Sequence, residues 1–167
     1  MTSETPQQRM RPPAHRVSRT AVWYWTARAA LTWLVILGLQ VLWLITGPSN
    51  VLAHVLVLSI SGLIAAIHMI VMPQWRYRIH RWEATRDAVY VQSGWITQER
   101  RLAPISRIQT VDSKRGPIEQ LLGLADVVVT TASAAGPLVI QGLDQTVAEA
   151  LVAELTATAQ AAPGDAT

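Results

Sequence analysis

Two long apolar runs dominate the first half of the chain. They cover residues 29–45 and 51–72, and neither contains Asp, Glu, Lys or Arg. About 20 apolar residues are needed to cross a hydrocarbon core of about 30 Å, so the first run is near the lower limit and the second is ample. Only the five residues TGPSN separate them, and this short turn predicts an antiparallel hairpin of two membrane-spanning helices.

A signal peptide would also produce an early apolar run. However, nearly thirty mostly polar residues precede the first run, no small-residue cleavage site follows it, and the second run comes immediately afterwards. We therefore interpret both runs as membrane spans.

After Pro73 the pattern changes to short runs in which apolar and polar residues alternate, bounded by Gly, Pro, Asp or Ser. Such runs are typical of β-strands. The predicted strands cover residues 74–84, 88–92, 95–101, 105–113, 124–131 and 137–142.

The last element is predicted to be an amphipathic helix that begins after Asp144, a suitable N-cap. Its apolar residues recur at helical spacing, and they are Val147, Ala150, Leu151, Ala153 and Leu155. Short antiparallel strands followed by one such helix predict a small β-barrel or sandwich capped by the helix.

The predicted fold class is therefore an α+β membrane protein. Residues 1–20 are expected to be a disordered basic N-terminus, residues 21–73 the transmembrane hairpin, residues 74–159 a cytoplasmic β domain, and residues 160–167 a disordered tail.

Arginine predicts the orientation of the hairpin. The net charge is only +3, but the bases cluster outside the two spans, whereas the turn between the spans has none. These bases are Arg9, Arg11, Arg16, Arg19, Arg28, Arg76, Arg78 and Arg81. The positive-inside rule predicts a multi-pass protein of the inner or plasma membrane with both termini in the cytoplasm. Because the bases flank apolar runs and do not line a folded face, nucleic-acid binding is not expected.

Polar side chains within the spans have two interpretations. Gln40, Ser59 and Ser61 can form hydrogen bonds between the helices, and the small residues Gly38 and Gly62 let the helices approach each other. His54 and His68 lie about 20 Å apart along a helix, which is too far to share a metal ion. Packing and a proton path both remain open for these histidines.

The segment LAPISRIQTVDSKRGPIEQLLGLADVVVTTAS, followed by GPLVIQGLDQTVAEALVAEL, resembles the bacterial pleckstrin-homology (PH) family of YdbS-like membrane proteins. The resemblance covers about residues 25–157 and implies a PH-like domain behind a two-span hairpin. The matching motif residues are Pro104, Arg107, Ile108, Gln109, Gly116, Pro117, Gly123, Leu124, Thr131 and Ala132. Gln120 stands where many relatives have a base.

These motif residues also have a structural interpretation. Pro117 is suited to begin a short helical turn and Gly123 to end it with a positive φ. We predict that Ile118, Leu121 and Leu122 cover the apolar interior, so that Leu121→Asp would unfold the domain. A binding role for the motif is the alternative.

Several residues are candidates for contact with the membrane surface. They are Trp75, Arg76, Arg78, Arg81, Trp82, Lys114 and Arg115. Each exposed base near an anionic leaflet contributes roughly 1 kcal/mol without specificity. Simple membrane anchoring and a specific headgroup site both remain open for this set.

The sequence favours a non-catalytic interaction or scaffold module at the cytoplasmic face of the membrane. Cysteine is absent, and the His, Asp and Glu residues show no spacing typical of a catalytic triad, a metal site or a phosphate loop, so no cofactor is expected. The expected partners are membrane lipids and a protein partner or a second copy of the chain. The alternative is a membrane-embedded enzyme or an accessory subunit of a lipid- or envelope-related complex.

Overall fold

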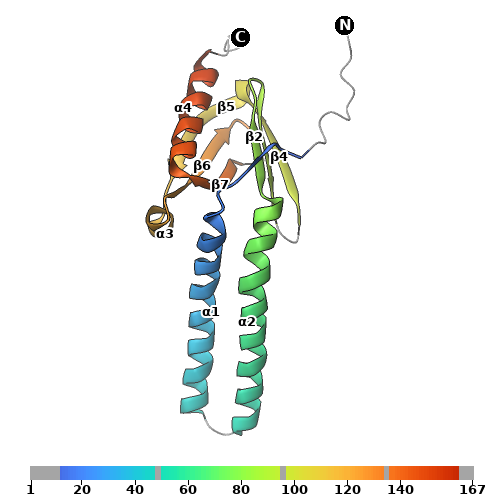
Figure 1. Cartoon of the computed structure of the whole chain (residues 1–167), viewed down its shortest axis with the longest axis vertical. Coiled ribbons are helices and arrows are strands. Elements are labelled where there is room, and N and C mark those ends of the chain that lie inside the picture. Colours follow the sequence, from blue (N-terminus) through green and yellow to red (C-terminus); the bar gives the residue numbers. More distant parts are fainter. Residues whose placement is uncertain (1–11, 48–49, 95–96, 134–135, 162–167) are drawn as a thin grey trace.

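The computed structural model describes residues 12–47, 50–94, 97–133 and 136–161. It shows a long helical hairpin with a small β domain at one end (Figure 1). The hairpin consists of α1 (Ala21–Thr46) and α2 (Val51–Ile79), which contain the two predicted apolar runs. Both helices are long and apolar enough to cross a membrane, and most of their large apolar side chains are exposed. This exposure is expected of helices that face lipid.

The β domain contains two antiparallel sheets. One sheet has the order β1-β2-β3-β4, and the other has the order β5-β6-β7. The strands are β1 (His15–Arg16), β2 (Arg81–Ala84), β3 (Ala88–Ser93), β4 (Glu99–Pro104), β5 (Ile108–Lys114), β6 (Leu124–Thr131) and β7 (Leu138–Asp144). The short helix α3 (Pro117–Leu121) joins β5 to β6, and α4 (Gln145–Ala161) follows β7. The result is a PH-like sandwich with a C-terminal helix, and its described strands form no closed barrel.

The helical hairpin is inserted between the first two strands of the sandwich. His15 and Arg16 of β1 pair with Trp82 and Arg81 of β2, so the chain leaves the sheet, passes through both helices and returns to the neighbouring strand. The prediction that residues 1–20 are disordered is therefore wrong for residues 12–20, while residues 1–11 and 162–167 lie outside the described residues. A strand of two residues has no detectable alternation, which is why β1 could not be predicted.

The predicted strand at residues 74–84 is also wrong in its first half. The helix α2 continues through the buried Pro73 to Ile79, and β2 begins only at Arg81. Proline costs a helix one backbone hydrogen bond, but membrane helices tolerate it because neighbouring groups compensate. Arg76 and Arg78 then occupy the last turn of the helix, where basic side chains interact favourably with the helix dipole.

The other strands match the prediction more closely. The predicted strand 124–131 coincides with β6, and 88–92 falls within β3. Residues 95–96 of the predicted strand 95–101 lie outside the described residues, and β4 extends further, to Pro104. A 3-10 turn at Ile105–Arg107 delays the start of β5.

The core lies between the two sheets and α4. Leu124, Val127 and Val129 of β6 are completely buried, as are Val89 of β3 and Ile140 of β7.

The helix α4 packs on this core through a stripe at spacings of three and four residues. The stripe consists of Ala148, Leu151 and Leu155. Of the predicted apolar face, Leu151 and Leu155 are buried, but Val147, Ala150 and Ala153 are exposed. The predicted apolar face of α4 therefore differs from the observed one by a rotation about the helix axis.

The turn around α3 differs from the prediction in one important residue. Ile118 and Leu122 are partly buried against the core, as predicted, but Leu121 is 87% exposed. Residues 118 and 122 are four apart and share one face of the turn, whereas residue 121 lies on another face. Gly123 then ends the turn with a φ of +66°, as predicted. The predicted role of Leu121 in the core is therefore wrong.

The first turn of α1 is part of the domain core. Ala21 and Trp25 are buried, and the backbone N–H of Ser18 donates to the carbonyl of Gly142 in β7 at 2.9 Å. The Ser18 hydroxyl donates to a carboxylate oxygen of Asp144 at 2.7 Å. A Cβ placed on Gly142 would lie only 2.6 Å from the Cβ of Ala21, so glycine permits this close approach. The helix and the domain are thus in direct contact without a flexible linker.

Contacts within the hairpin include polar pairs. The Gln40 side chain donates to the Ser61 hydroxyl at 2.9 Å, as predicted. The Trp33 indole donates to Nδ1 of His68 at 2.9 Å, and the His54 ring lies 3.8 Å from the Trp43 ring between centroids. Both histidines therefore take part in contacts that hold the hairpin together.

Candidate functional site

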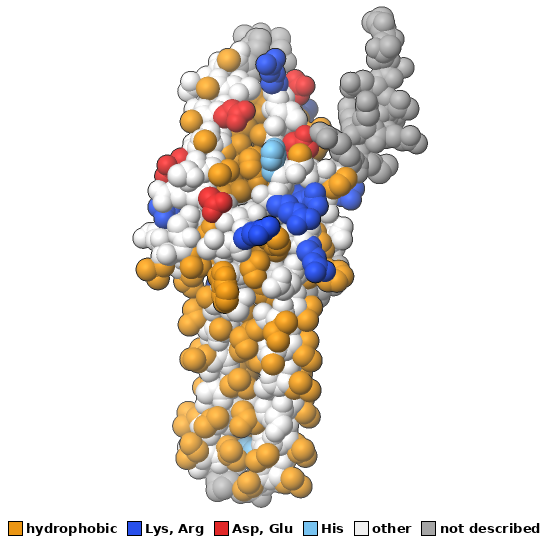
Figure 2. Space-filling model, in the orientation of Figure 1, with side chains coloured by type: hydrophobic (Ala, Val, Ile, Leu, Met, Phe, Trp, Pro, Cys, Tyr) orange, Lys and Arg blue, Asp and Glu red, His pale blue; other side chains and the backbone are white. Residues whose placement is uncertain are grey.

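Basic side chains gather on the domain directly beside the apolar hairpin (Figure 2). Of the predicted membrane-surface residues, Arg78 at the end of α2 and Lys114 at the end of β5 are exposed. Trp75 of α2 has about half of its surface exposed. These three side chains remain available for headgroups.

The other predicted surface residues have structural contacts. The Arg76 guanidinium lies 4.8 Å over the Trp25 ring and donates to the side-chain oxygen of Gln141. This cation–π contact joins the two helices of the hairpin. Trp82 is only 9% exposed and lies 5.1 Å from the His15 ring. A surface role for Arg76 and Trp82 is therefore not supported.

Arg81 and Arg115 are neither fully exposed nor fully buried. Arg81 is half-buried in β2, opposite Gln92 of β3. The Nε of Arg115 donates to the backbone carbonyl of Leu124 at 3.0 Å. This bond ties the residues before α3 to the start of β6, so Arg115 stabilises the turn.

Residues of the family motif lie in and around α3 and β5, where they have structural contacts. Pro117 is the first residue of α3, and Leu124 is completely buried at the start of β6. The backbone N–H of Ala132 donates to the carbonyl of Arg107 at 3.2 Å, and Gln109 lies at a register shift of β5. Pro117, Leu124, Arg107 and Ala132 thus take part in backbone contacts or packing.

A buried histidine lies where α2 enters the domain. His80 is 1% exposed, and its Nε2 accepts a long hydrogen bond of 3.4 Å from the Gln141 N–H. Its Nδ1 has no partner among the described residues. Burial, together with the nearby Arg76 charge, lowers the pKa of His80 from 6.5 to about 4. The imidazole is therefore neutral at physiological pH.

A second buried titratable group lies near the same junction. Asp126 of β6 accepts a hydrogen bond of 2.8 Å from the backbone N–H of Gly142. Burial raises the pKa of Asp126 above its ordinary value, although this hydrogen bond opposes the effect.

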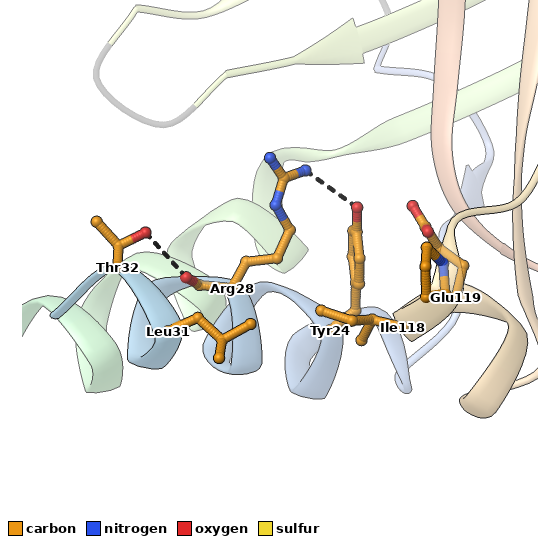
Figure 3. A pocket seen from close by; sticks show the side chains of 7 residues that line it. Tyr24, Arg28, Leu31, Thr32, Ile118 and Glu119 are labelled. Atoms are coloured by element: carbon orange, nitrogen blue, oxygen red, sulfur yellow. Dashed lines mark hydrogen bonds between the residues drawn. The ribbon is translucent and has the colours of Figure 1, made fainter. Parts of the chain in front are cut away.

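A cavity of about 360 Å³ lies between α1 and α3. Its lining residues are Tyr24, Arg28, Leu31, Thr32, Pro117, Ile118 and Glu119. Figure 3 shows the Tyr24 hydroxyl between the Arg28 guanidinium and the Glu119 carboxylate. Nη1 of Arg28 donates to this hydroxyl at 3.0 Å, and the Glu119 carboxylate lies on the other side of the hydroxyl. The cavity therefore combines a cation, a phenol and an anion.

Glu119 is unusual because it is an acidic residue with only 8% of its surface exposed. A Cβ on Gly116 would clash with one of its carboxylate oxygens. Because glycine has no side chain, position 116 leaves room for the Glu119 carboxylate. Sequence reasoning missed this cluster, because nothing in the sequence brings Tyr24 and Arg28 close to a residue some ninety positions later.

Among the residues that the structure describes, no group of three or more His, Asp or Glu side chains could hold a metal ion.

A model of the bacterial PH domain family matches residues 20–159, which is most of the chain. The chain belongs to the bacterial PH domain family. This result confirms the resemblance inferred from the motif around α3, and the match begins at the first turn of α1 and ends in α4.

A relative of this PH-domain protein is the UPF0699 transmembrane protein YdbS of Bacillus subtilis (strain 168). The two are 30% identical over 81 residues, which cover 44% of this chain and 51% of the relative. The chain thus matches about half the length of that relative. No solved structure matches the chain significantly. The two apolar helices and the transmembrane relative identify a membrane protein.

Proposed function

We propose that this bacterial PH-domain protein is a non-catalytic interaction module held at the cytoplasmic face of the cell membrane. The observation that carries the proposal is the insertion of the hairpin between β1 and β2. Because both ends of the hairpin continue into the same sheet, and α1 packs directly on β7, the membrane anchor fixes the orientation of the domain. An anchor of this kind presents one surface of the domain to partners beside the membrane.

The strand β5 offers a surface for a protein partner or a second copy of the chain. It is an edge strand of its sheet, and most of its side chains are exposed. Edge strands have backbone groups that can pair with another strand, which is a common mode of recognition. Arg78, Lys114 and Trp75 add contacts with anionic headgroups at the membrane surface.

The alternative is a membrane enzyme or an accessory subunit of a lipid- or envelope-related complex. The PH family supports the module over the enzyme. An accessory subunit would use the same edge strand, so it differs from the module only in its partner.

A photo-crosslinking residue at position 113 tests the edge of β5. Ser113 is exposed on this strand, whereas Glu154 is exposed on α4 and is a matched control position. We expect crosslinking in intact membranes to give one reproducible product from position 113, either a dimer or a single partner, and none from position 154. Equal products from both positions, or none from position 113, would contradict the proposed interaction surface.

Cysteine labelling tests the orientation. The chain has no native cysteine, so Ser49→Cys and Ser133→Cys each introduce a single thiol. Position 49 falls between α1 and α2 in the sequence and lies outside the described residues, and Ser133 is exposed in the domain. We expect an impermeant reagent to label position 49 in intact cells and position 133 only after permeabilisation. The reverse pattern would overturn the cytoplasmic location.

A further inference from the structure

We propose that the cavity between α1 and α3 binds the headgroup of a phospholipid that carries both a phosphate and a primary ammonium group, as in phosphatidylethanolamine. The proposal rests on the membrane anchoring described above, but not on which side of the membrane the domain faces. It assigns a specific lipid to a site formed jointly by the hairpin and the domain.

The cavity lies at the depth where a headgroup is expected. Arg28 is the last charged residue before the charge-free run of α1. Leu31 and Thr32, which line the same cavity, lie about one helical turn further along, roughly 5 Å deeper. The cavity therefore spans the boundary between phosphates and acyl chains.

Arg28 provides the site for phosphate. Its side chain is exposed, and its hydrogen-bond partner is the Tyr24 hydroxyl, so most of its five N–H donors remain available. No ion pair links Arg28 to a carboxylate among the described residues. A guanidinium binds phosphate with two parallel hydrogen bonds, which makes arginine well suited to this contact.

Glu119 provides the site for the ammonium group. Only 8% of the residue is exposed, and no ion pair with a described basic side chain compensates the carboxylate charge. A carboxylate that is largely removed from water and has no cation beside it is costly, so a ligand that brings a cation gains by binding here. The hydroxyl of Tyr24 lies between the two charged groups and accepts a hydrogen bond of 3.0 Å from Arg28, so both groups line the same part of the cavity (Figure 3). A short two-carbon linker between phosphate and ammonium suits two opposite charges that line one cavity.

The charges of the cavity distinguish between common phospholipids. A phosphatidylglycerol headgroup would satisfy Arg28 but bring no cation to Glu119. A phosphatidylcholine headgroup brings a cation, but its methylated nitrogen has no N–H to donate and needs more room. The ethanolamine headgroup satisfies both sites.

Most of the remaining lining of the cavity is apolar. Leu31, Pro117 and Ile118 form the apolar part of the cavity. Figure 3 shows Leu31 and Ile118 beside the polar cluster, from α1 and α3 respectively. Leu121, on the same short helix α3, is almost fully exposed. An exposed leucine beside a transmembrane helix is stabilised by contact with acyl chains.

Lipid retention by the purified full-length protein tests the proposal. The protein is placed in nanodiscs that contain equal amounts of phosphatidylethanolamine, phosphatidylcholine and phosphatidylglycerol, and the lipids that remain bound after release are counted by native mass spectrometry. We expect phosphatidylethanolamine to be retained about tenfold over the other two, because one charge-assisted hydrogen bond contributes about this factor.

Three variants separate the two halves of the site. Glu119→Gln should abolish the preference for phosphatidylethanolamine, and Arg28→Gln should weaken retention of all three lipids. Arg19→Gln removes an exposed charge just before α1 but outside the cavity, so it should behave like the wild type. Protease resistance of the domain shows whether each variant is folded.

A soluble competitor separates a lipid site from a free-headgroup site. Glycerophosphoethanolamine lacks acyl chains, so we expect it not to displace the retained lipid, and displacement at equal concentration would overturn the lipid assignment. Equal retention of the three lipids by the wild type would overturn the proposal even if a variant failed to fold. Equal losses in Arg28→Gln and Arg19→Gln would show nonspecific attraction. Because both nanodisc leaflets have the same composition, these outcomes are independent of the orientation and partner experiments.

Discussion

Leu124→Ala should lower the free energy of unfolding of the domain by about 2–5 kcal/mol, whereas Leu121→Ala should change it by no more than about 0.5 kcal/mol. The two leucines are only three residues apart in the family motif, yet Leu124 is completely buried and Leu121 is 87% exposed. Truncation of Leu124 leaves a cavity in the core between the sheets, whereas Leu121 has few contacts to lose. Urea titration in detergent, followed by a short protease pulse, measures both variants.

Leu121→Asp tests directly whether residue 121 lies on the surface of the domain. Placing the charge on an exposed position should leave the protease-resistant domain intact, although it should weaken any contact of α3 with acyl chains. Leu122→Asp is the matched variant, because the adjacent residue Leu122 is partly buried against the core. If Leu121→Asp unfolded the domain while Leu124→Ala did not, the observed assignment of core and surface around α3 would be incorrect.

Residues 118–122 illustrate the limits of prediction from the sequence. The motif Gly116-Pro117 and Gly123 predicts where the short helix begins and ends, and the structure agrees. The apolar character of Ile118, Leu121 and Leu122 does not reveal which of them faces the core. Five residues make barely more than one helical turn, so the pattern has no periodicity to define a face.

The membrane spans were predictable because their signal is local. A continuous apolar run identifies a span without any tertiary information, and both runs fall inside α1 and α2. The ends of these helices were not predictable in the same way. Between Gln74 and Ile79, aromatic and basic residues alternate as in a strand, but they occupy the end of a membrane helix, where the same residue types are common.

The cavity between α1 and α3 was beyond prediction because it depends on the insertion of the hairpin into the sandwich. Arg28 was predicted only as a topology signal, and Tyr24 and Glu119 were not considered as a pair. The bonds that join α1 to β7 bring these three residues together. A functional site formed by tertiary packing has no characteristic residue spacing in the sequence.

The stability of the domain should fall by about 3 kcal/mol as the pH is lowered from 6.5 to 4, because of His80. This histidine has an ordinary pKa of 6.5 and a folded-state pKa of about 4. Below pH 6.5 the unfolded chain takes up a proton that the folded domain does not accept, so unfolding becomes easier, and the effect levels off below pH 4. A difference of about 2.5 between the two pKa values corresponds to roughly 3 kcal/mol. Protonation would also place a second N–H donor opposite the backbone N–H of Gln141.

Thermal unfolding in detergent, followed by tryptophan fluorescence across this pH range, measures the effect in a background without Asp126. The raised folded-state pKa of Asp126 acts in the opposite direction, since it makes stability fall as the pH rises from about 3.8. Asp126→Asn keeps an oxygen that can accept the Gly142 N–H and removes this second titration.

In that background, His80→Gln retains an acceptor for the Gln141 N–H without a titratable ring. Its stability should vary much less with pH than that of Asp126→Asn alone, because burial of the neutral imidazole causes the dependence. Equal pH dependence in both proteins would assign the acid sensitivity to groups other than His80.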